Sequence, residues 1–244
     1  TVSRFLSLLA AAEGGDAASF CAAYGAFFLN LSETEAGLCF SAVLERLVRF
    51  DDNAFSRAAA NCAEGSNYRL LKTAAEHDLS AIAQLSAISA ALLKEAAGAS
   101  QDAFVAALPE YAQSEQSLFN LFDLIDLAGE METLYRTNGF GKFAEFGAFR
   151  WAAGLQGVAN PDPVRLCDLK EYDYERGLVA ANTLDFLEGR GGGNLLLYGD
   201  RGTGKSSTVK ALANEYRGRG LRIVELPFNR LSDLPAAIET LRNV

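Results

Sequence analysis

The residues best suited to chemistry lie in residues 194–207, NLLLYGDRGTGKSS. Gly199, Gly204, Lys205 and Ser206 fit the spacing G-x-x-x-x-G-K-[ST], and a further glycine stands at position 202. Glycine adopts backbone conformations that are closed to other residues, so main-chain N–H groups in such a loop can turn inward around phosphate oxygens. The pattern therefore predicts a phosphate-binding loop.

Each polar position in this loop has an expected role in holding a nucleotide and Mg²⁺. Lys205 would reach the β and γ phosphates and stabilise charge during phosphoryl transfer, which makes it the catalytic candidate. The Ser206 hydroxyl would be a magnesium ligand, and Ser207 would contact the α phosphate. The complete predicted phosphate site is Gly199, Asp200, Arg201, Gly202, Thr203, Gly204, Lys205, Ser206 and Ser207.

The sequence on either side of the loop fits a strand that leads into a helix. The apolar run at residues 195–198 predicts a short, buried, parallel strand. Apolar residues then return at helical spacing, at Val209, Leu212, Ala213 and Tyr216. This predicts a helix that begins near Lys205 and directs its free N–H groups at the phosphates. The alternative is a chance match, a glycine-rich turn that binds nothing, and the flanking pattern counts against it.

Length and charge narrow the class of protein. The 244 residues are half hydrophobic, which is enough for one large domain or two ordinary ones. The formal net charge is −9, and residues 1–150 account for it, with 10 Lys and Arg against 19 Asp and Glu. A general nucleic-acid-binding role is disfavoured, because it needs a basic surface that replaces counterions.

Cysteine and histidine usage argues against a metal centre. Cys21, Cys39, Cys62 and Cys167 have no C-x-x-C spacing, and the lone histidine, His77, cannot complete a zinc set with them. We expect a reduced, cytoplasmic chain with buried thiols, and a surface position for His77 between two acidic residues. No apolar run approaches the length of a membrane-spanning helix, so no membrane association is expected.

The predicted fold class is α/β with more than one domain. Residues 1–150 carry helical patterns such as Phe40, Val43, Leu44 and Leu47, and predict an all-α domain of about six to eight helices. Residues 151–165 contain two closely spaced prolines and predict a boundary or an ordered linker. Residues 166–244 predict a partial P-loop nucleotide-binding domain. Its expected parts besides the loop are a helix on Leu178, Ala181, Leu184 and Leu187, a strand at 221–226, and a last helix capped by Asp233.

Two features of the first 151 residues have both a functional and a structural interpretation. Five aromatic residues could form a stacking platform, but their spacing of mostly three along a helix favours the core or a domain interface. They are Phe140, Phe143, Phe146, Phe149 and Trp151. The Asp51-Asp52 pair could serve as a metal or acid/base site, but capping of a helix at residues 55–60 is the favoured interpretation.

Three stretches resemble one known family. FRWAAGLQGVANPDPVRLCDLKEYDYERG at residues 149–177 and NLLLYGDRGTGKSSTVKALANEY at 194–216 are similar to an uncharacterised bacterial P-loop ATPase family of AAA+ type, domain-of-unknown-function family 815. FSRAAA at residues 55–60 resembles a short signature of its helical part. Asn160 stands where a histidine is usual, and Lys170-Glu171 stands where an apolar residue and a glycine are usual.

The resemblance implies ATP with Mg²⁺ as ligand and places Leu166, Asp168, Leu169 and Tyr172 near the adenine base. It also implies an intact ATPase that remodels a protein partner, with homo-oligomerisation by family analogy. The acidic helical part would select the partner. AAA+ hydrolysis further needs an acidic magnesium-binding strand, a sensor residue and an arginine finger. No such strand follows residue 226, so we expect the 244 residues to bind ATP without turning it over.

Three other functions stay open at this stage. A P-loop kinase or other phosphotransferase would need a second substrate pocket and usually carries its loop near the N-terminus. A GTPase would need an N-K-x-D motif, which the sequence lacks. A non-catalytic, nucleotide-sensing helical interaction protein would bind nucleotide without releasing phosphate.

Overall fold

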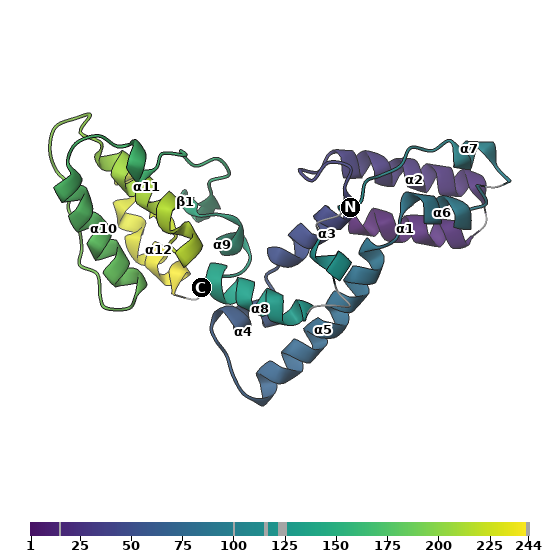
Figure 1. Cartoon of the computed structure of the whole chain (residues 1–244), viewed down its shortest axis with the longest axis horizontal. Coiled ribbons are helices and arrows are strands. Elements are labelled where there is room, and N and C mark those ends of the chain that lie inside the picture. The colour runs from purple at the N-terminus through teal and green to yellow at the C-terminus, as the bar shows by residue number, and fades with distance from the viewer. Residues whose placement is uncertain (15, 100, 115–116, 122–125, 243–244) are drawn as a thin grey trace. The chain divides into compact units, whose positions relative to one another are not determined.

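The computed structural model describes residues 1–14, 16–99, 101–114, 117–121 and 126–242 (Figure 1). These residues form two compact units. The first unit consists of Thr1–Arg49 with Glu64–Met131, and the second consists of Phe50–Ala63 with the described residues from Glu132 onward. The units differ from the expected domains, because residues 132–165 and a short piece around residue 57 belong with the phosphate loop in the second unit.

The described residues of the first unit are almost entirely helical. Its elements are α1 (Val2–Glu13), α2 (Ala17–Ser32), α3 (Phe40–Arg49), α5 (Ser66–Ser86), α6 (Ala90–Ala96), α7 (Ala103–Ala106) and the 3-10 turn η1 (Leu118–Leu121). Helix α8 (Leu127–Asn138) begins in this unit and continues into the second. The predicted helical character is therefore confirmed for the described part of this unit.

Aromatic packing holds the first unit together. The Phe5 ring centroid lies 4.1 Å from that of Phe40, and Phe27 meets Phe40 edge-on at 5.4 Å. The hydroxyl of Tyr111 donates to the carbonyl of Ile88 at 2.6 Å, which satisfies the polar end of a buried ring. Of the predicted apolar face of α3, Phe40, Val43 and Leu44 are buried, whereas Leu47 is exposed.

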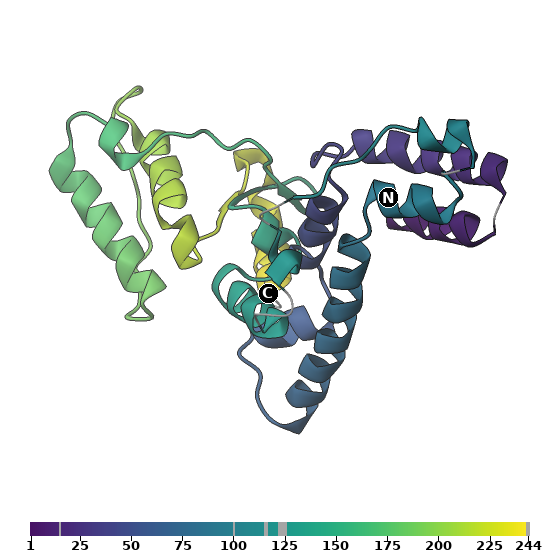
Figure 2. The ribbon, with the colours of Figure 1, turned by 45° about the vertical axis from the view of Figure 1, so that its right-hand side comes forward.

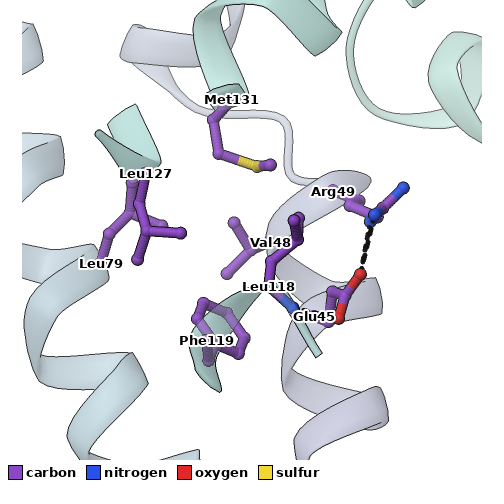
Figure 3. A pocket seen from close by; sticks show the side chains of 8 residues that line it. All are labelled: Glu45, Val48, Arg49, Leu79, Leu118, Phe119, Leu127 and Met131. Atoms are coloured by element: carbon purple, nitrogen blue, oxygen red, sulfur yellow. Dashed lines mark hydrogen bonds and ion pairs between the residues drawn. The ribbon is translucent and has the colours of Figure 1, made fainter. Parts of the chain in front are cut away.

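A very small cavity lies elsewhere in the first unit (Figure 3). Its volume is about 10 Å³, and apolar side chains such as Val48, Leu79 and Met131 surround it. The Glu45 carboxylate at its edge accepts hydrogen bonds from Arg49 Nε at 2.9 Å, from Ser117 Oγ at 3.1 Å and from the Leu118 N–H at 3.2 Å. An apolar space of this size stays dry, so we interpret it as a packing gap rather than a binding site.

The second unit combines helices with a small sheet. Its further elements are α4 (Ala54–Ala60), α9 (Lys142–Glu145), β1 (Ala148–Trp151), β2 (Leu155–Gly157), η2 (Leu166–Asp168), α10 (Asp173–Leu187), α11 (Lys205–Tyr216), η3 (Arg217–Arg219), β3 (Ile223–Glu225), η4 (Phe228–Asp233) and α12 (Leu234–Leu241). The sheet order is β2-β1-β3. Strand β1 pairs antiparallel with β2, with Phe149 opposite Gly157, and parallel with β3, with Phe149 opposite Val224. The predicted mixture of helix and sheet is confirmed.

Helices α10 and α11 lie beside each other, as Figures 1 and 2 both show. The segment before them, predicted as a boundary or an ordered linker, is fastened to α11 by its polar side chains. Lys210 Nζ lies 3.2 Å from Asp162 Oδ2, and Asn214 Nδ2 donates to the carbonyls of Asp162 and Val164, both at 2.8 Å. The Lys210 hydrogen bond also lowers the pKa of Asp162.

The predicted strand at residues 195–198 is absent. These residues form no regular element, and Leu195, Leu196 and Tyr198 are 50%, 84% and 88% exposed. A strand forms only when neighbouring strands accept and donate its main-chain hydrogen bonds. Within the described residues, no strand pairs with this run. The other predicted strand, at 221–226, is confirmed as β3.

The aromatic cluster belongs to the core, as predicted, but its backbone is not a continuous helix. Phe140, Phe149 and Trp151 are buried, at 6%, 1% and 6% exposure. Helix α9 ends at Glu145, and residues 148–151 form β1, in which burial alternates along the strand. The all-α prediction for residues 1–150 was therefore wrong at its C-terminal end, because Phe149 and Trp151 also fit the two-residue period of a strand.

One predicted helix cap is wrong, and another lacks its side-chain hydrogen bond. Asn53, not the Asp51-Asp52 pair, caps α4: its Oδ1 accepts from the Ser56 N–H at 2.9 Å, and Ser56 Oγ accepts from the Asn53 N–H at 2.9 Å. Asp233 is the N-cap residue of α12, as predicted, but its side chain forms no cap hydrogen bond. Its carboxylate instead accepts from Trp151 Nε1 at 3.2 Å, which ties α12 to the sheet.

Candidate functional site

The candidate phosphate loop has glycine where its backbone is left-handed. Gly199, Gly202 and Gly204 have φ angles of +132°, +91° and +79°. A Cβ atom added at Gly202 or Gly204 would meet nothing within 4 Å. The backbone conformation, and not lack of space, is therefore what requires glycine at these two positions.

The Lys205 side chain folds back over the loop. Its Nζ donates to the carbonyl of Gly199 at 3.0 Å, to the carbonyl of Asp200 at 2.6 Å and to Thr203 Oγ1 at 3.1 Å. Thr203 Oγ1 in turn donates to the Asp200 carbonyl at 2.9 Å. The ammonium group thus lies against three neutral oxygen acceptors, and no carboxylate among the described residues pairs with it.

Helix α11 begins directly at the loop, as predicted. Gly204 is its N-cap and supplies no side chain to bond the first free N–H groups. The first turn contains no acidic residue, so the positive end of the helix dipole is not compensated within the helix. Thr208 anchors the turn through its N–H and Oγ1, which donate to the Gly204 carbonyl at 2.8 and 3.0 Å. Ser206 is exposed and Ser207 is half-buried.

A cavity of about 590 Å³ opens beside the loop. The loop side is formed by Gly199, Asp200, Thr203, Lys205 and Thr208, and the adjoining wall by residues 195–198. The opposite wall is formed by α10 and the residue before it: Tyr172, Glu175, Arg176, Leu178 and Val179. This volume falls within the range of ligand sites in proteins. Arg201, Gly202, Gly204, Ser206 and Ser207 do not line the cavity.

Arg176 shapes the start of α10. Its side chain is 12% exposed, and its Nη1 donates to the Lys170 carbonyl at 3.1 Å, while its Nη2 pairs with Asp173. The turn held in this way contains two left-handed residues in a row, Glu171 with φ +60° and Tyr172 with φ +57°. Arg176 thus helps to place Tyr172 on the cavity wall.

Of the four residues expected near a base, the structure brings one to this cavity. Tyr172 lines it and is 48% exposed. Leu166 and Asp168 belong to η2, which packs on α11, and Leu169 follows it. Asp168 Oδ2 accepts from the Arg165 N–H at 2.8 Å. Leu166, Asp168 and Leu169 therefore contribute to the turn beside α11 and do not line the cavity.

Sequence reasoning missed the contribution of α10. It predicted the helix through Leu178, yet Glu175, Arg176 and Val179 were not singled out as site residues. The helical period is visible in the sequence, but it does not show which face of α10 meets the loop. Only the packing of α10 beside α11 decides that.

No metal centre is evident among the described residues, since they contain no group of three or more His, Cys, Asp and Glu side chains that could hold an ion. All four thiols are free. Cys62 and Cys167 are exposed, which corrects the expectation of buried thiols, and Cys21 and Cys39 are half-buried. His77 is exposed on α5 beside Asp78, as predicted.

No single helix among the described residues is long and apolar enough to cross a bilayer. Helices α5 and α6 reach that length and composition only together, with a bend of 78° between them.

A family match covers the part of the chain that builds the candidate site. Residues 144–244 match the family described as "Protein of unknown function (DUF815)". The match supports a DUF815 assignment for this segment. The matched segment contains the sheet and every residue that lines the large cavity. No curated protein and no solved structure matches the chain.

Proposed function

We propose that the chain binds a nucleotide, in the first place ATP, with its phosphates in the loop at residues 199–207 and Mg²⁺ at the Ser206 hydroxyl. The observation that carries the proposal is the loop itself. Its glycines take left-handed conformations at positions 199, 202 and 204, and it ends in the uncapped start of α11. The same short stretch thus supplies the free N–H groups at the start of α11 and an ammonium group, and groups of these two kinds bind phosphate.

The position of Lys205 supports binding of an anion. Its ammonium group is bonded to neutral acceptors that belong to the loop itself. A phosphate oxygen is a stronger acceptor for an ammonium group than a neutral carbonyl is, because Coulomb attraction between opposite charges adds to the hydrogen bond. We therefore expect Lys205 to leave the Gly199 and Asp200 carbonyls when a phosphate enters, without having to break an ion pair.

The cavity supports a ligand larger than phosphate. It continues from the loop to a wall that combines apolar side chains, Leu178 and Val179, with the ring of Tyr172. A purine and its ribose fit such a mixed surface, with the phosphates toward Lys205. In this proposal Tyr172 is the base contact, while Leu166, Asp168 and Leu169 act by supporting the turn that precedes it.

For the intact protein we propose ATP hydrolysis that drives remodelling of a protein partner in the cytoplasm, with self-association. This part rests on the resemblance to AAA+ proteins. The carboxylates on the cavity wall are Glu175 and Asp200.

The second candidate is a nucleotide-sensing interaction protein. It is favoured by the lack of any acidic cluster among the described residues that could hold Mg²⁺ and activate water.

The test is a titration of the 244-residue chain with fluorescent Mg-ATP and Mg-GTP analogues. We expect Lys205→Ala to weaken binding by about 10- to 100-fold, the loss of one or more charge-assisted hydrogen bonds. Lys210→Ala is the matched control, because it removes an exposed lysine from the same helix outside the cavity. Equal affinity of wild type and Lys205→Ala would refute the phosphate site.

Turnover is measured on the same samples by phosphate release. Multiple-turnover ATP hydrolysis that disappears in Lys205→Ala would show an ATPase and contradict the expectation that the 244 residues only bind. Binding without phosphate release in the 244-residue chain and in longer versions of it would favour the sensing protein. Tighter binding of GTP than of ATP would favour the GTPase alternative.

A further inference from the structure

A second cavity in the second unit lies apart from the phosphate loop. Its volume is about 400 Å³, and it shares no lining residue with the larger cavity. The side chains around it come from segments that are distant in sequence: Asp52, Arg57, Phe140, Lys142, Phe143, Leu155 and Thr240. Its size lies within the range of small-molecule sites.

The backbone joins two sides of this cavity. The N–H of Gly141 donates to the carbonyl of Asp51 at 3.3 Å, which fastens the α9 side to the segment that leads into α4. Gly141 has φ +54°, and a Cβ there would lie 3.2 Å from the Asp52 Cβ. Only glycine allows this close approach without strain, so the arrangement around the cavity depends on the fold and not on mobile side chains.

The lining of the cavity combines apolar and charged side chains. Phe140, which is 6% exposed, supplies the apolar part together with Phe143 and Leu155. In the charged part, Arg57 Nε donates to Asp52 Oδ1 at 2.6 Å, and these two charges neutralise each other. Lys142 is left as the excess charge, since its Nζ meets only the Leu155 carbonyl, at 3.5 Å, among the described residues.

We propose that this cavity binds a carboxylate carried on an aromatic or branched apolar group. The apolar group lies against Phe140, Phe143 and Leu155, and the carboxylate accepts hydrogen bonds from Lys142. A monoanion matches the single excess positive charge, whereas a phosphate dianion would leave one negative charge uncompensated. Two sources share this chemistry, a free organic acid and the C-terminal residue of a peptide.

The experiment titrates the 244-residue chain by calorimetry with 3-phenylpropionate, with its amide, and with N-acetyl-Gly-Phe. We expect saturable binding of 3-phenylpropionate with a Kd on the order of 1 mM, the affinity that suits a ligand of this size. The amide, which lacks the charge, should bind at least about tenfold more weakly. Tighter binding of N-acetyl-Gly-Phe than of the free acid would identify a peptide C-terminus as the ligand.

Two variants locate the binding. Lys142→Gln should weaken binding of the acid by about tenfold, while Lys170→Gln, which removes an exposed lysine outside the cavity, should leave it unchanged. The proposal is overturned if neither acid binds saturably, if acid and amide bind equally, or if Lys142→Gln binds like the wild type. Unchanged thermal unfolding of both variants shows that a loss of binding is not a loss of fold.

Discussion

Arg222 provides the sharpest test of how the second unit is held together. Its guanidinium group is half-buried and donates to main-chain carbonyls alone among the described residues. Nε donates to Phe143 at 2.7 Å, Nη2 to Asn138 at 2.8 Å, and Nη1 to Arg217 at 3.1 Å and Leu221 at 3.0 Å. The two shortest bonds reach Asn138, the last residue of α8, and Phe143 within α9, so one side chain joins both helices to the segment that enters β3.

The perturbation is Arg222→Met, which keeps an apolar stem and removes the donors. A hydrogen bond to a charged group contributes about 1.5–3 kcal/mol, and two such bonds to distant carbonyls are lost. The stabilisation from these bonds is partly offset by the cost of burying the charged guanidinium group. Burial lowers the pKa of Arg222 for this reason, and the nearby Arg217 lowers it further. The methionine variant avoids that cost. We therefore expect the free energy of unfolding to fall by about 2–3 kcal/mol, less than the sum of the two bonds.

Urea unfolding followed by tryptophan fluorescence measures this effect in the second unit, which contains both Arg222 and the reporting tryptophan. Trp151 is the only tryptophan in the sequence, and it is buried in β1 of the same unit. With a urea dependence of about 2 kcal/mol per molar, the midpoint should fall by about 1 M. The urea midpoint of Arg222→Lys should lie between those of the wild type and Arg222→Met, since an ammonium group cannot reach all of the carbonyls.

Arg219→Met is the matched control. Arg219 is an exposed arginine with one ion pair, to Glu188, and its removal should change the midpoint little. A midpoint for Arg222→Met within error of wild type would refute the reasoning. So would an equal loss in Arg219→Met, because arginine removal in general would then explain the result.

Three further predictions concern other parts of the chain. Asn53→Ala removes the capping box of α4 and should lower the free energy of unfolding by about 1 kcal/mol, measured by the same fluorescence assay. Glu171→Gly removes the strain of a non-glycine residue in the left-handed conformation, with φ +60°, and should raise the free energy of unfolding by roughly 0.5–1 kcal/mol. Glu171→Ala keeps the strain and should not raise it. Burial raises the pKa of Tyr24 to about 12, with a smaller contribution from Glu110. The folded state therefore retains this proton more strongly, and its stabilisation is complete below about pH 10 and lost as pH rises through about 12. An ultraviolet titration should show one fewer tyrosine ionising in this range in Tyr24→Phe.

Local patterns predicted the features that depend on local chemistry. The helix at α11 follows from the spacing of Val209, Leu212 and Ala213, since 3.6-residue periodicity is a property of the segment itself. The loop conformation follows for the same reason, because glycines at 202 and 204 are placed where the backbone must be left-handed. Nothing distant has to be known for either.

The cap at α4 shows where local reasoning loses precision. The Asp51-Asp52 pair is the cap that the sequence analysis predicts for this helix, but the cap is Asn53, the residue that follows the pair. Asp52 instead pairs with Arg57. Several neighbouring residues can accept a hydrogen bond from the first turn, and the one that does is decided by where the helix begins, which tertiary packing sets.

Features that need a partner could not be predicted from their own segment. An apolar run such as 195–198 indicates a tendency to be buried, but a strand exists only when another strand bonds to it. Residues 223–225 become a strand because β1 lies beside them, with Ala148 opposite Ile223. The two apolar runs look alike in the sequence, and only their neighbours distinguish them.

The candidate site contains both kinds of feature, one part that its own segment predicts and one part that depends on packing. Its phosphate end is encoded in consecutive residues, and that is why it can be recognised without a structure. Its other wall belongs to α10. Leu178 and Val179 on this helix are distant from Lys205 in the sequence, and they reach the cavity only because α10 packs beside α11. In the proposed nucleotide site, the motif therefore predicts which chemical group would be bound, and the choice between one nucleotide and another would depend on side chains that the fold brings to it. Substitutions at Tyr172 and Leu178 should accordingly change the preference between ATP and GTP, while substitution of Lys205 should weaken both equally.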